Sequence, residues 1–521
     1  MSFSKPNRSA ATITTTRVEP APISGICVTC LDGCEGPCEI GRSAIKGREI
    51  IYPQPFGKVT AGADKDYPVD FSHFNIQGTC VGAVGIEPDP DKAVFPVVDC
   101  TTALGADGGI KLAFPVFTGA VGSTDIARIN WEDMAVGAAI SGIVIIVGEN
   151  VCGMDPQLEL RNGRVVKSPE MDRRINIYKQ WFDGTGGLIV QANVEDTRLG
   201  AMEYVIDKHG VQILELKWGQ GAKDIGGEVK LPTLERALQL KERNYIVLPD
   251  PRDRASQEAF HRGGISEFER HSRLGMVTEE GFYKEVERLR ALGAKYVTLK
   301  TGAYRPADLA RAIKFSSVAK IDLLTIDGAG GGTGMSPWRM MNEWGIPTVH
   351  LECLAYQMCE RLRAKGAYIP PIAIAGGLSL EDHIFKAIAL AAPYVKAVCL
   401  GRAIMTAAMV GKTHGKLVAQ KMERLGRPKE EGFEELFAVG AQLKERFGRD
   451  FAKIPPGAIG MYSYIDRLRQ GLQQLMAGAR KFALKYITRD DLVALTREAA
   501  EISGIPYVMD SDREEVDRIL G

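Results

Sequence analysis

From about residue 110 onward, short apolar runs alternate with amphipathic stretches of roughly 10 to 15 residues. Helical periodicity is clearest at 278–293 and 305–316. The apolar runs have the length and residue types of buried strands: 114–122, 141–149, 187–194, 211–219, 244–250, 295–303, 321–332, 347–353, 371–377 and 397–404. Regular alternation of strand and helix predicts a parallel sheet covered by helices.

Glycine and polar residues gather where these predicted strands end, as TGAVG, GEN, KTG, DGAGGG, AGG and GR. A (β/α)8 TIM barrel places its active site at that end of its strands. A doubly wound sheet is the structural alternative. The number of strands, and the lack of an early GxGxxG turn, favour the barrel.

Two late strand ends have the form of a phosphate grip. Gly376 and Gly377 end one strand, and Gly401 and Arg402 end the next. Glycines let backbone N–H groups approach a phosphate, and an arginine adds a cation. The segment IDGAGGGTGMSP (326–337) predicts a tight loop whose amides face a ligand.

Four parts of the chain are expected. A loose arm spans 1–25, a cysteine-rich segment 26–109, the barrel 110–412, and a helical cap 413–521. The pattern of the cap predicts several charged amphipathic helices. We expect them to serve as a scaffold or as an oligomer contact.

Composition narrows the function classes. Of 521 residues 45% are hydrophobic, and 65 basic residues balance 65 acidic ones. The balance indicates no nucleic-acid partner and leaves room for a homo-oligomer. The first 25 residues lack the apolar core of a secretory signal, and no run is long enough to span a membrane, so a cytoplasmic location is expected.

Cysteines cluster in ICVTCLDGCEGPCEIG (26–41), at Cys27, Cys30, Cys34 and Cys38. In a reducing compartment such thiols are more often metal ligands than disulfides. This crowding favours an iron–sulfur cluster, expected to be 4Fe-4S, over zinc or free redox thiols. The GPCEIG ending resembles a cluster-binding segment of carbon monoxide dehydrogenases, which makes Cys80 an alternative ligand.

Several motifs together resemble the FMN-binding synthase domain of glutamate synthases, over roughly residues 110 to 490. The matching segments, in chain order, are GAVGSTDIA (119–127), GENV (148–151), QGAKDIGGEVKLP (220–232), TLKTG with Lys300, GGTGMSP (331–337) and the two phosphate turns.

The resemblance implies FMN as a cofactor. Lys300 would place a positive charge at the N1–C2 edge of the flavin and raise its potential; the alternative is a solvated lysine at a strand end. The implied FMN-binding residues are Thr118, Gly119, Ala120, Val121, Gln191, Lys300, Gly331, Gly332, Thr333, Gly334, Gly376, Gly377, Gly401 and Arg402. The alternative for Gln191 is a purely structural role of its side-chain amide.

The resemblance also implies a substrate site. Lys217, Gln220 and Lys223 belong to the loop that meets the oxo acid in that family, where cations pair with carboxylates. Glu149 matches the carboxylate beside which ammonia reaches the flavin. The alternative for Lys217, Gln220 and Lys223 is that they lie in an exposed polar loop. The alternative for Glu149 is a structural glutamate at the edge of the core.

Three features depart from that family. The stretch MTAAMVGKTHGK (405–416) has no cysteine where glutamate synthases carry a three-iron cluster. A PPPHHD-like segment is replaced by LPDPRDRAS (248–256), which brings Arg252 and Arg254. Since the sequence shows no N-terminal domain with a nucleophilic cysteine, we expect the chain to lack a glutaminase of its own. The departures change electron entry and substrate contacts while the flavin scaffold is kept.

The expected activity is reductive amination of 2-oxoglutarate, with electrons passing from the N-terminal cluster, folded back over the barrel, to FMN. Expected partners are a small 2-oxo or amino acid, a donor such as ferredoxin or an NAD(P)H-linked subunit, and an amidotransferase that supplies ammonia. The alternatives are an N-methylglutamate-synthase-like or other amine oxidoreductase, a non-catalytic electron-transfer subunit, and a zinc-bound barrel without flavin.

Overall fold

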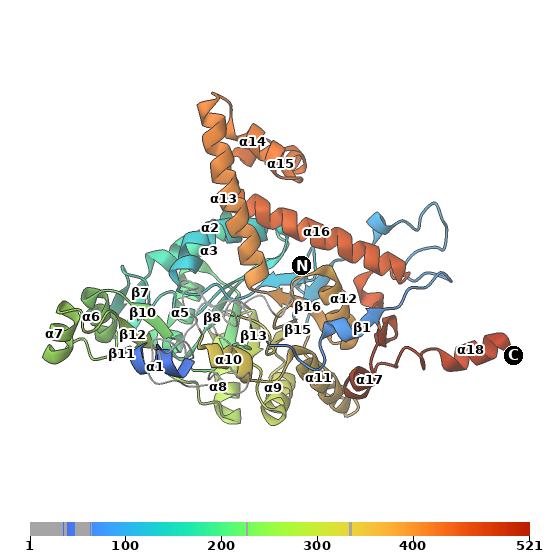
Figure 1. The fold of residues 1–521 in the computed structure, drawn as a ribbon, viewed down its shortest axis with the longest axis horizontal. Coiled ribbons are helices and arrows are strands. Elements are labelled where there is room, and N and C mark those ends of the chain that lie inside the picture. Colours follow the sequence, from blue (N-terminus) through green and yellow to red (C-terminus); the bar gives the residue numbers. More distant parts are fainter. Residues whose placement is uncertain (1–34, 36–38, 47–62, 64, 226–227, 333–335) are drawn as a thin grey trace.

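A closed barrel of eight parallel strands forms the centre of the computed structural model (Figure 1). The structure describes residues 35, 39–46, 63, 65–225, 228–332 and 336–521. The barrel strands are β4 (Val116–Thr118), β5 (Val144–Val147), β8 (Gly187–Ala192), β9 (Ile213–Lys217), β13 (Tyr296–Thr301), β14 (Leu323–Asp327), β15 (Ile372–Ala375) and β16 (Val395–Leu400). The predicted barrel is therefore confirmed, and the doubly wound alternative is excluded because β16 pairs with β4.

Helices connect these strands on the outside of the barrel. They are α2 (Asp125–Ser141), α3 (Pro169–Trp181), α4 (Val194–Leu199), α5 (Ala201–His209), α8 (Glu279–Ala291), α9 (Pro306–Val318), α10 (Trp338–Glu343), α11 (Thr348–Arg363), α12 (Glu381–Leu390) and α13 (Arg402–Arg424). The periodicity predictions for 278–293 and 305–316 correspond to α8 and α9.

Two predicted barrel strands are wrong. Residues 348–353 are the first turns of helix α11, whose N-cap is Pro347, and the buried positions recur at helical spacing beyond that short window. Residues 244–250 contain β11 (Ile246–Leu248), which lies in a separate antiparallel sheet with β10 (Glu228–Leu231) and β12 (Phe268–His271). This small sheet, with α6 (Leu234–Glu242) and α7 (Arg254–His261), is inserted between β9 and α8.

The barrel interior is apolar toward the amino ends of its strands and polar toward their carboxyl ends. Apolar residues such as Phe117, Ile146 and Ile189 fill it with the hairpin of β2 (Thr102–Leu104) and β3 (Ile110–Leu112). Buried polar residues such as Thr298 and Glu215 follow further along the strands. The hairpin closes one end, so the chemistry is confined to the other.

The C-terminal part is mainly helical, as predicted. Its elements are α14 (Lys429–Leu436), α15 (Gly440–Phe447), α16 (Pro456–Gly478), β17 (Leu492–Ala494), α17 (Arg497–Ser503) and α18 (Arg513–Leu520). Helix α16 packs against α2 and α13, while α13 carries α14 and α15 away from the barrel (Figure 1). A Cβ on Gly411 would lie 2.8 Å from the Cα of Gly460, so the two glycines let α13 and α16 touch backbone to backbone.

The remaining elements are α1 (Glu39–Lys46), β1 (Phe74–Ile76), β6 (Glu159–Arg161) and β7 (Arg164–Lys167). β1 pairs with β17, which ties the part of the chain before the barrel to its C-terminal part. In the described part of the chain, no helix combines the length and the apolar character that crossing a membrane requires.

Candidate functional site

A polar row crosses the mouth of the barrel, by which we mean the carboxyl ends of the eight strands and the loops that follow them. Lys300 on β13 lies in register with Lys217 on β9 and with Thr325 on β14. Residues opposite one another on paired strands share a face. The row continues to Ala373, which packs in the barrel interior, so these side chains face inward.

Lys300 forms a buried ion pair. Its Nζ lies 2.9 Å from Oδ2 of Asp327, and the two side chains are only 9% and 14% exposed. Burial alone would lower the pKa of Lys300, but the Asp327 carboxylate outweighs burial and holds that pKa above its ordinary value. The barrel mouth therefore carries a permanently charged ammonium group.

A second charged group joins β5 and β9. The Nζ of Lys217 lies 2.6 Å from Oε1 of Glu149 and 2.7 Å from Oε1 of Gln220. Burial would raise the pKa of Glu149, but Lys217 overcomes that effect and lowers the pKa to about 2. Burial, together with the nearby charge of Lys217, lowers the pKa of Lys223 to about 7. Glu149, Lys217, Gln220 and Lys223, predicted from separate motifs, thus come together.

Two buried polar atoms near the row have no hydrogen-bond partner among the residues that the structure describes. The Nε2 of Gln191 donates to Oε1 of Glu215 at 2.6 Å, while the Oε1 of Gln191 has no hydrogen-bond partner. The Oγ1 of Thr325 also has none. Buried polar atoms are normally paired, so a ligand with hydrogen-bonding edges fits this place.

Two late glycine turns follow the neighbouring strands β15 and β16 at the barrel mouth. Gly376 and Gly377 have φ values of +119° and +93°, which favour glycine, and the hydroxyl of Thr348 lies 2.7 Å from the carbonyl oxygen of Gly376. Gly401 is the N-cap of α13, and a Cβ there would meet no atom within 4 Å. A helix N-terminus facing open space at a glycine fits a phosphate group.

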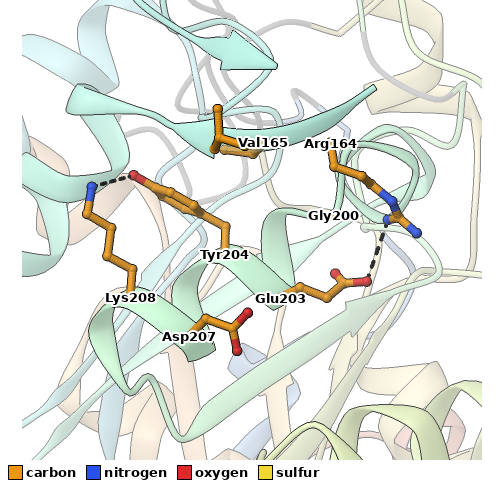
Figure 2. Close-up of a pocket in the computed structure, with 8 residues that line it drawn as sticks. Arg164, Val165, Gly200, Glu203, Tyr204, Asp207 and Lys208 are labelled. Carbon is orange, nitrogen blue, oxygen red and sulfur yellow. Dashed lines mark hydrogen bonds and ion pairs between the residues drawn. The ribbon is translucent and has the colours of Figure 1, made fainter. Parts of the chain in front are cut away.

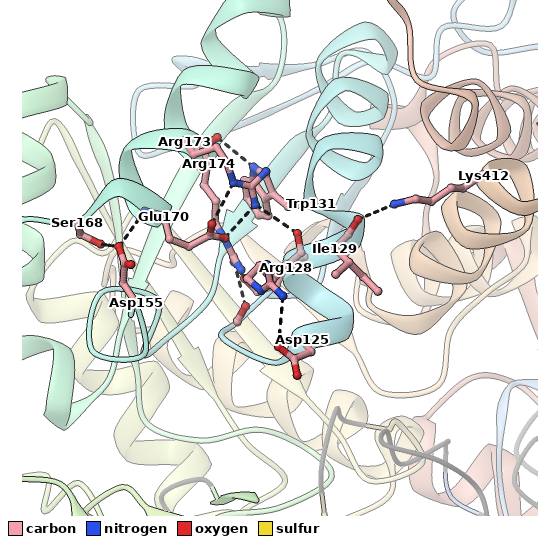
Figure 3. Close-up of polar contacts among 12 residues, drawn as sticks. Asp125, Arg128, Ile129, Trp131, Asp155, Ser168, Glu170, Arg173, Arg174 and Lys412 are labelled. Atoms are coloured by element: carbon pink, nitrogen blue, oxygen red, sulfur yellow. Dashed lines mark hydrogen bonds and ion pairs between the residues drawn. The ribbon is translucent and has the colours of Figure 1, made fainter. Parts of the chain in front are cut away.

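The loop after β4 is held from outside the barrel (Figure 3). The amides of Gly119 and Val121 donate to the carbonyl oxygens of Leu400 and Ile146. Among the hydrogen bonds of the described residues, the Ala120 amide has no such backbone partner and could donate to a ligand. The hydroxyl of Thr118 accepts a hydrogen bond from the Ile146 amide at 3.1 Å. This predicted FMN-binding side chain therefore links β4 to β5 within the barrel wall.

Arg174 of α3 completes this support. Its Nη1 donates to the carbonyl oxygens of Val121 and Gly122 at 2.8 and 2.9 Å, while Glu170 accepts from its Nε. The guanidinium also stacks over the ring of Trp131 (Figure 3). Sequence reasoning missed Arg174, although it occupies the buried stripe of α3 with Met171, Ile175 and Tyr178.

Several predicted residues are not part of this mouth or lie outside the described residues. Arg252 and Arg254, 64% and 92% exposed, pair with Asp250 and Glu258 on the outer surface. Gly331 approaches Gly376, whereas Gly332 is exposed. Outside the described residues lie Thr333, Gly334, Cys27, Cys30, Cys34 and Cys38. Cys80 is exposed, and the described residues contain no group of three or more His, Cys, Asp or Glu that could hold a metal ion.

A surface pocket of about 580 Å³ lies elsewhere, between β7 and α5 (Figure 2). Two contacts join residues of its lining: Arg164 pairs with Glu203 at 3.5 Å, and Lys208 donates to the hydroxyl of Tyr204 at 2.9 Å. None of the predicted site residues lines it, so we place the chemistry at the barrel mouth.

Residues 269–413 match the family model described as the conserved region in glutamate synthase. A stretch of 242 residues is 28% identical to an archaeal-type glutamate synthase [NADPH] of Dehalococcoides mccartyi, covering 44% of each chain. The chain thus spans less than half the length of this relative. This confirms the predicted resemblance: the chain carries a glutamate-synthase-like synthase region.

Solved structures with a similar fold are more distant. An (S)-mandelate dehydrogenase chimera has a TM-score of 0.44 and 13% identity, covering 81% of this chain and 88% of that chain. A mandelate oxidase with a monooxide FMN adduct has a TM-score of 0.44 and 12% identity, covering 80% and 87%. The fold assignment rests on the closed barrel itself.

Proposed function

We propose that this chain is an FMN-dependent oxidoreductase of the glutamate-synthase type, which reduces the imino acid formed from a 2-oxo acid and ammonia. The leading 2-oxo acid is 2-oxoglutarate. One observation supports the proposal above the others: the inward row with Lys300 and the open helix N-terminus at Gly401 lie at the mouth of the same glutamate-synthase-like barrel. FMN, when bound, supplies hydride transfer.

The residues at the mouth fit the parts of FMN. Gly376, Gly377, Gly401 and Arg402 would hold the phosphate at the N-terminus of α13, where backbone N–H groups favour an anion. Lys300 would present its charge to the ring edge, where the side chains of Gln191 and Thr325 offer polar atoms that have no partner in the described part of the chain. Gly331 and the Ala120 amide would border the ring.

The group around Glu149 would receive the substrate. Lys217 and Lys223 would pair with the carboxylate next to the reacting carbon, and Gln220 would fix the orientation of Lys217. Because Lys223 has a pKa of about 7, it can hold or release a proton at neutral pH. Glu149 stays ionised and would attract ammonium.

We also propose that Cys27, Cys30, Cys34 and Cys38 bind an iron–sulfur cluster that delivers electrons to the flavin. The spacing of these cysteines supports this, as does the absence of cysteine from 405–416. The electron donor would be ferredoxin or an NAD(P)H-linked partner. Iron and acid-labile sulfide should disappear when the four cysteines are replaced by serine. Unchanged iron and sulfide contents would show that these cysteines do not bind the cluster.

The proposed activity is tested by loading the purified chain with FMN, reducing it without oxygen, and adding 2-oxo acids together with ammonia or methylamine. Reoxidation of the flavin by 2-oxoglutarate and ammonia, with formation of glutamate, is the expected result. Preference for methylamine would favour an N-methylglutamate-synthase-like activity. No reoxidation by any pair would reject the proposed reaction.

A further inference from the structure

Arg270 is a buried cation that the proposed chemistry leaves unused. It lies on β12 of the small sheet and is 1% exposed. A guanidinium carries five N–H donors. In the described part of the chain its one hydrogen-bond partner is the hydroxyl of Ser272, and its Nε has none. Burying an incompletely paired charge costs several kcal/mol, which makes this arrangement unusual.

The position of Arg270 links the small sheet to the barrel mouth. Its Cζ lies 5.2 Å from the ring centroid of Tyr245, whose hydroxyl is 3.3 Å from Oδ1 of Asn150. Asn150 directly follows Glu149, the proposed ammonium site. Arg270 therefore lies between the small sheet and the loop after β5, next to the proposed substrate site.

Three carboxylates act on Arg270 through their charge, but each is engaged elsewhere. Glu195 pairs with Arg273 at 2.9 Å. Glu149 pairs with Lys217, and Asp196 accepts the amide of Asn150 at 2.9 Å. Burial also raises the pKa of Asp196 to about 7, so its negative charge is incomplete at neutral pH. Arg270 consequently keeps positive charge that an incoming anion can neutralise.

We propose that Arg270 receives a second carboxylate of the substrate, so that the site selects dicarboxylic 2-oxo acids over monocarboxylic ones. The inference rests on the proposed function, in which Lys217 and Lys223 take the first carboxylate. Planar donors of arginine match a carboxylate with two parallel hydrogen bonds. The substrate would enter between the small sheet and the loop after β5, with the Ser272 hydroxyl orienting the guanidinium.

The test is calorimetric titration of the full-length, FMN-loaded chain with 2-oxoglutarate and with 2-oxobutanoate, which lacks the second carboxylate. The unaltered chain should prefer 2-oxoglutarate by about tenfold or more, the value of a charge-assisted hydrogen bond. Arg270→Gln should abolish this preference while leaving 2-oxobutanoate binding unchanged, and Arg270→Lys should restore part of it. Arg252→Gln, an exposed arginine next to the same sheet, is the control and should behave as the unaltered chain.

Equal binding of the two acids by the unaltered chain would overturn the proposal, as would an undiminished preference in Arg270→Gln. If that variant does not fold, Ser272→Ala replaces it, and 2-oxoglutarate binding should then weaken selectively. Binding is measured without turnover. Failure of FMN loading or of flavin reoxidation therefore rejects the proposed function. Equal binding of the two acids by the unaltered chain, or an undiminished preference in Arg270→Gln, rejects only the role of Arg270.

Discussion

Replacing Lys300 by methionine removes the charged member of the buried pair with Asp327 while keeping a side chain of similar length. The Asp327 carboxylate then remains buried without its ammonium partner, 2.9 Å away in the intact chain. Removing one member of a buried pair costs about 3–5 kcal/mol. Since both side chains are largely shielded from water, we expect an effect of this size on the free energy of unfolding.

The same change should weaken FMN binding, because the ring edge loses a charge-assisted contact. Such a contact contributes about 1.5–3 kcal/mol, or about ten- to a hundredfold in Kd. The flavin potential should also fall, since the reduced ring gains negative charge that the ammonium stabilises.

A double variant separates the two effects. Lys300→Met combined with Asp327→Asn leaves no orphaned charge, so urea denaturation should show most of the lost stability restored. FMN fluorescence titration and dye-coupled potentiometry should still show weak binding and a low potential. Normal FMN affinity and potential in the double variant would refute the flavin role of Lys300 and leave only a structural ion pair.

Three further predictions concern the surroundings of this pair. Gly401→Ala should keep stability within about 0.5 kcal/mol, because its Cβ meets open space, yet lower FMN affinity by filling the phosphate cradle; a normal affinity would move the phosphate elsewhere. Arg174→Gln should cost about 3 kcal/mol and weaken FMN binding through the loop after β4, whereas the partly exposed Arg173→Gln should change little in the same denaturation and titration assays. Burial raises the pKa of Asp196 to about 7, so the folded chain holds a proton that the unfolded chain releases above pH 3.8, and stability falls as the pH rises between these values. Asp196→Asn should flatten that slope in denaturation curves measured across the window, and an unchanged slope would contradict the assignment.

The barrel and much of its mouth were predictable because their signals are local. Apolar runs ended by glycine or charged residues mark the strands and their carboxyl ends, so Lys300 and Gly401 could be placed at the mouth from the chain alone. Glu149 and Lys217 were assigned to one site through the resemblance to glutamate synthases, and the barrel brings them together because the carboxyl ends of parallel strands meet at one edge.

The remaining features depend on contacts between distant segments. Nothing near Lys300 in the sequence identifies Asp327 as its partner, because β13 and β14 are brought together only by the barrel. The run at 347–353 is too short to distinguish a buried strand from the first turns of α11. Arg270 resembles an ordinary surface arginine in a charged segment until the small sheet folds against the barrel and buries it.

The most direct test of the account is anaerobic reoxidation of the reduced, FMN-loaded chain by 2-oxoglutarate and ammonia, followed by flavin absorbance and by glutamate analysis. We expect return of the oxidised flavin spectrum, with one glutamate formed per flavin reoxidised. A flavin that stays reduced with every 2-oxo acid and amine would contradict the central claim that this barrel mouth reduces an imino acid.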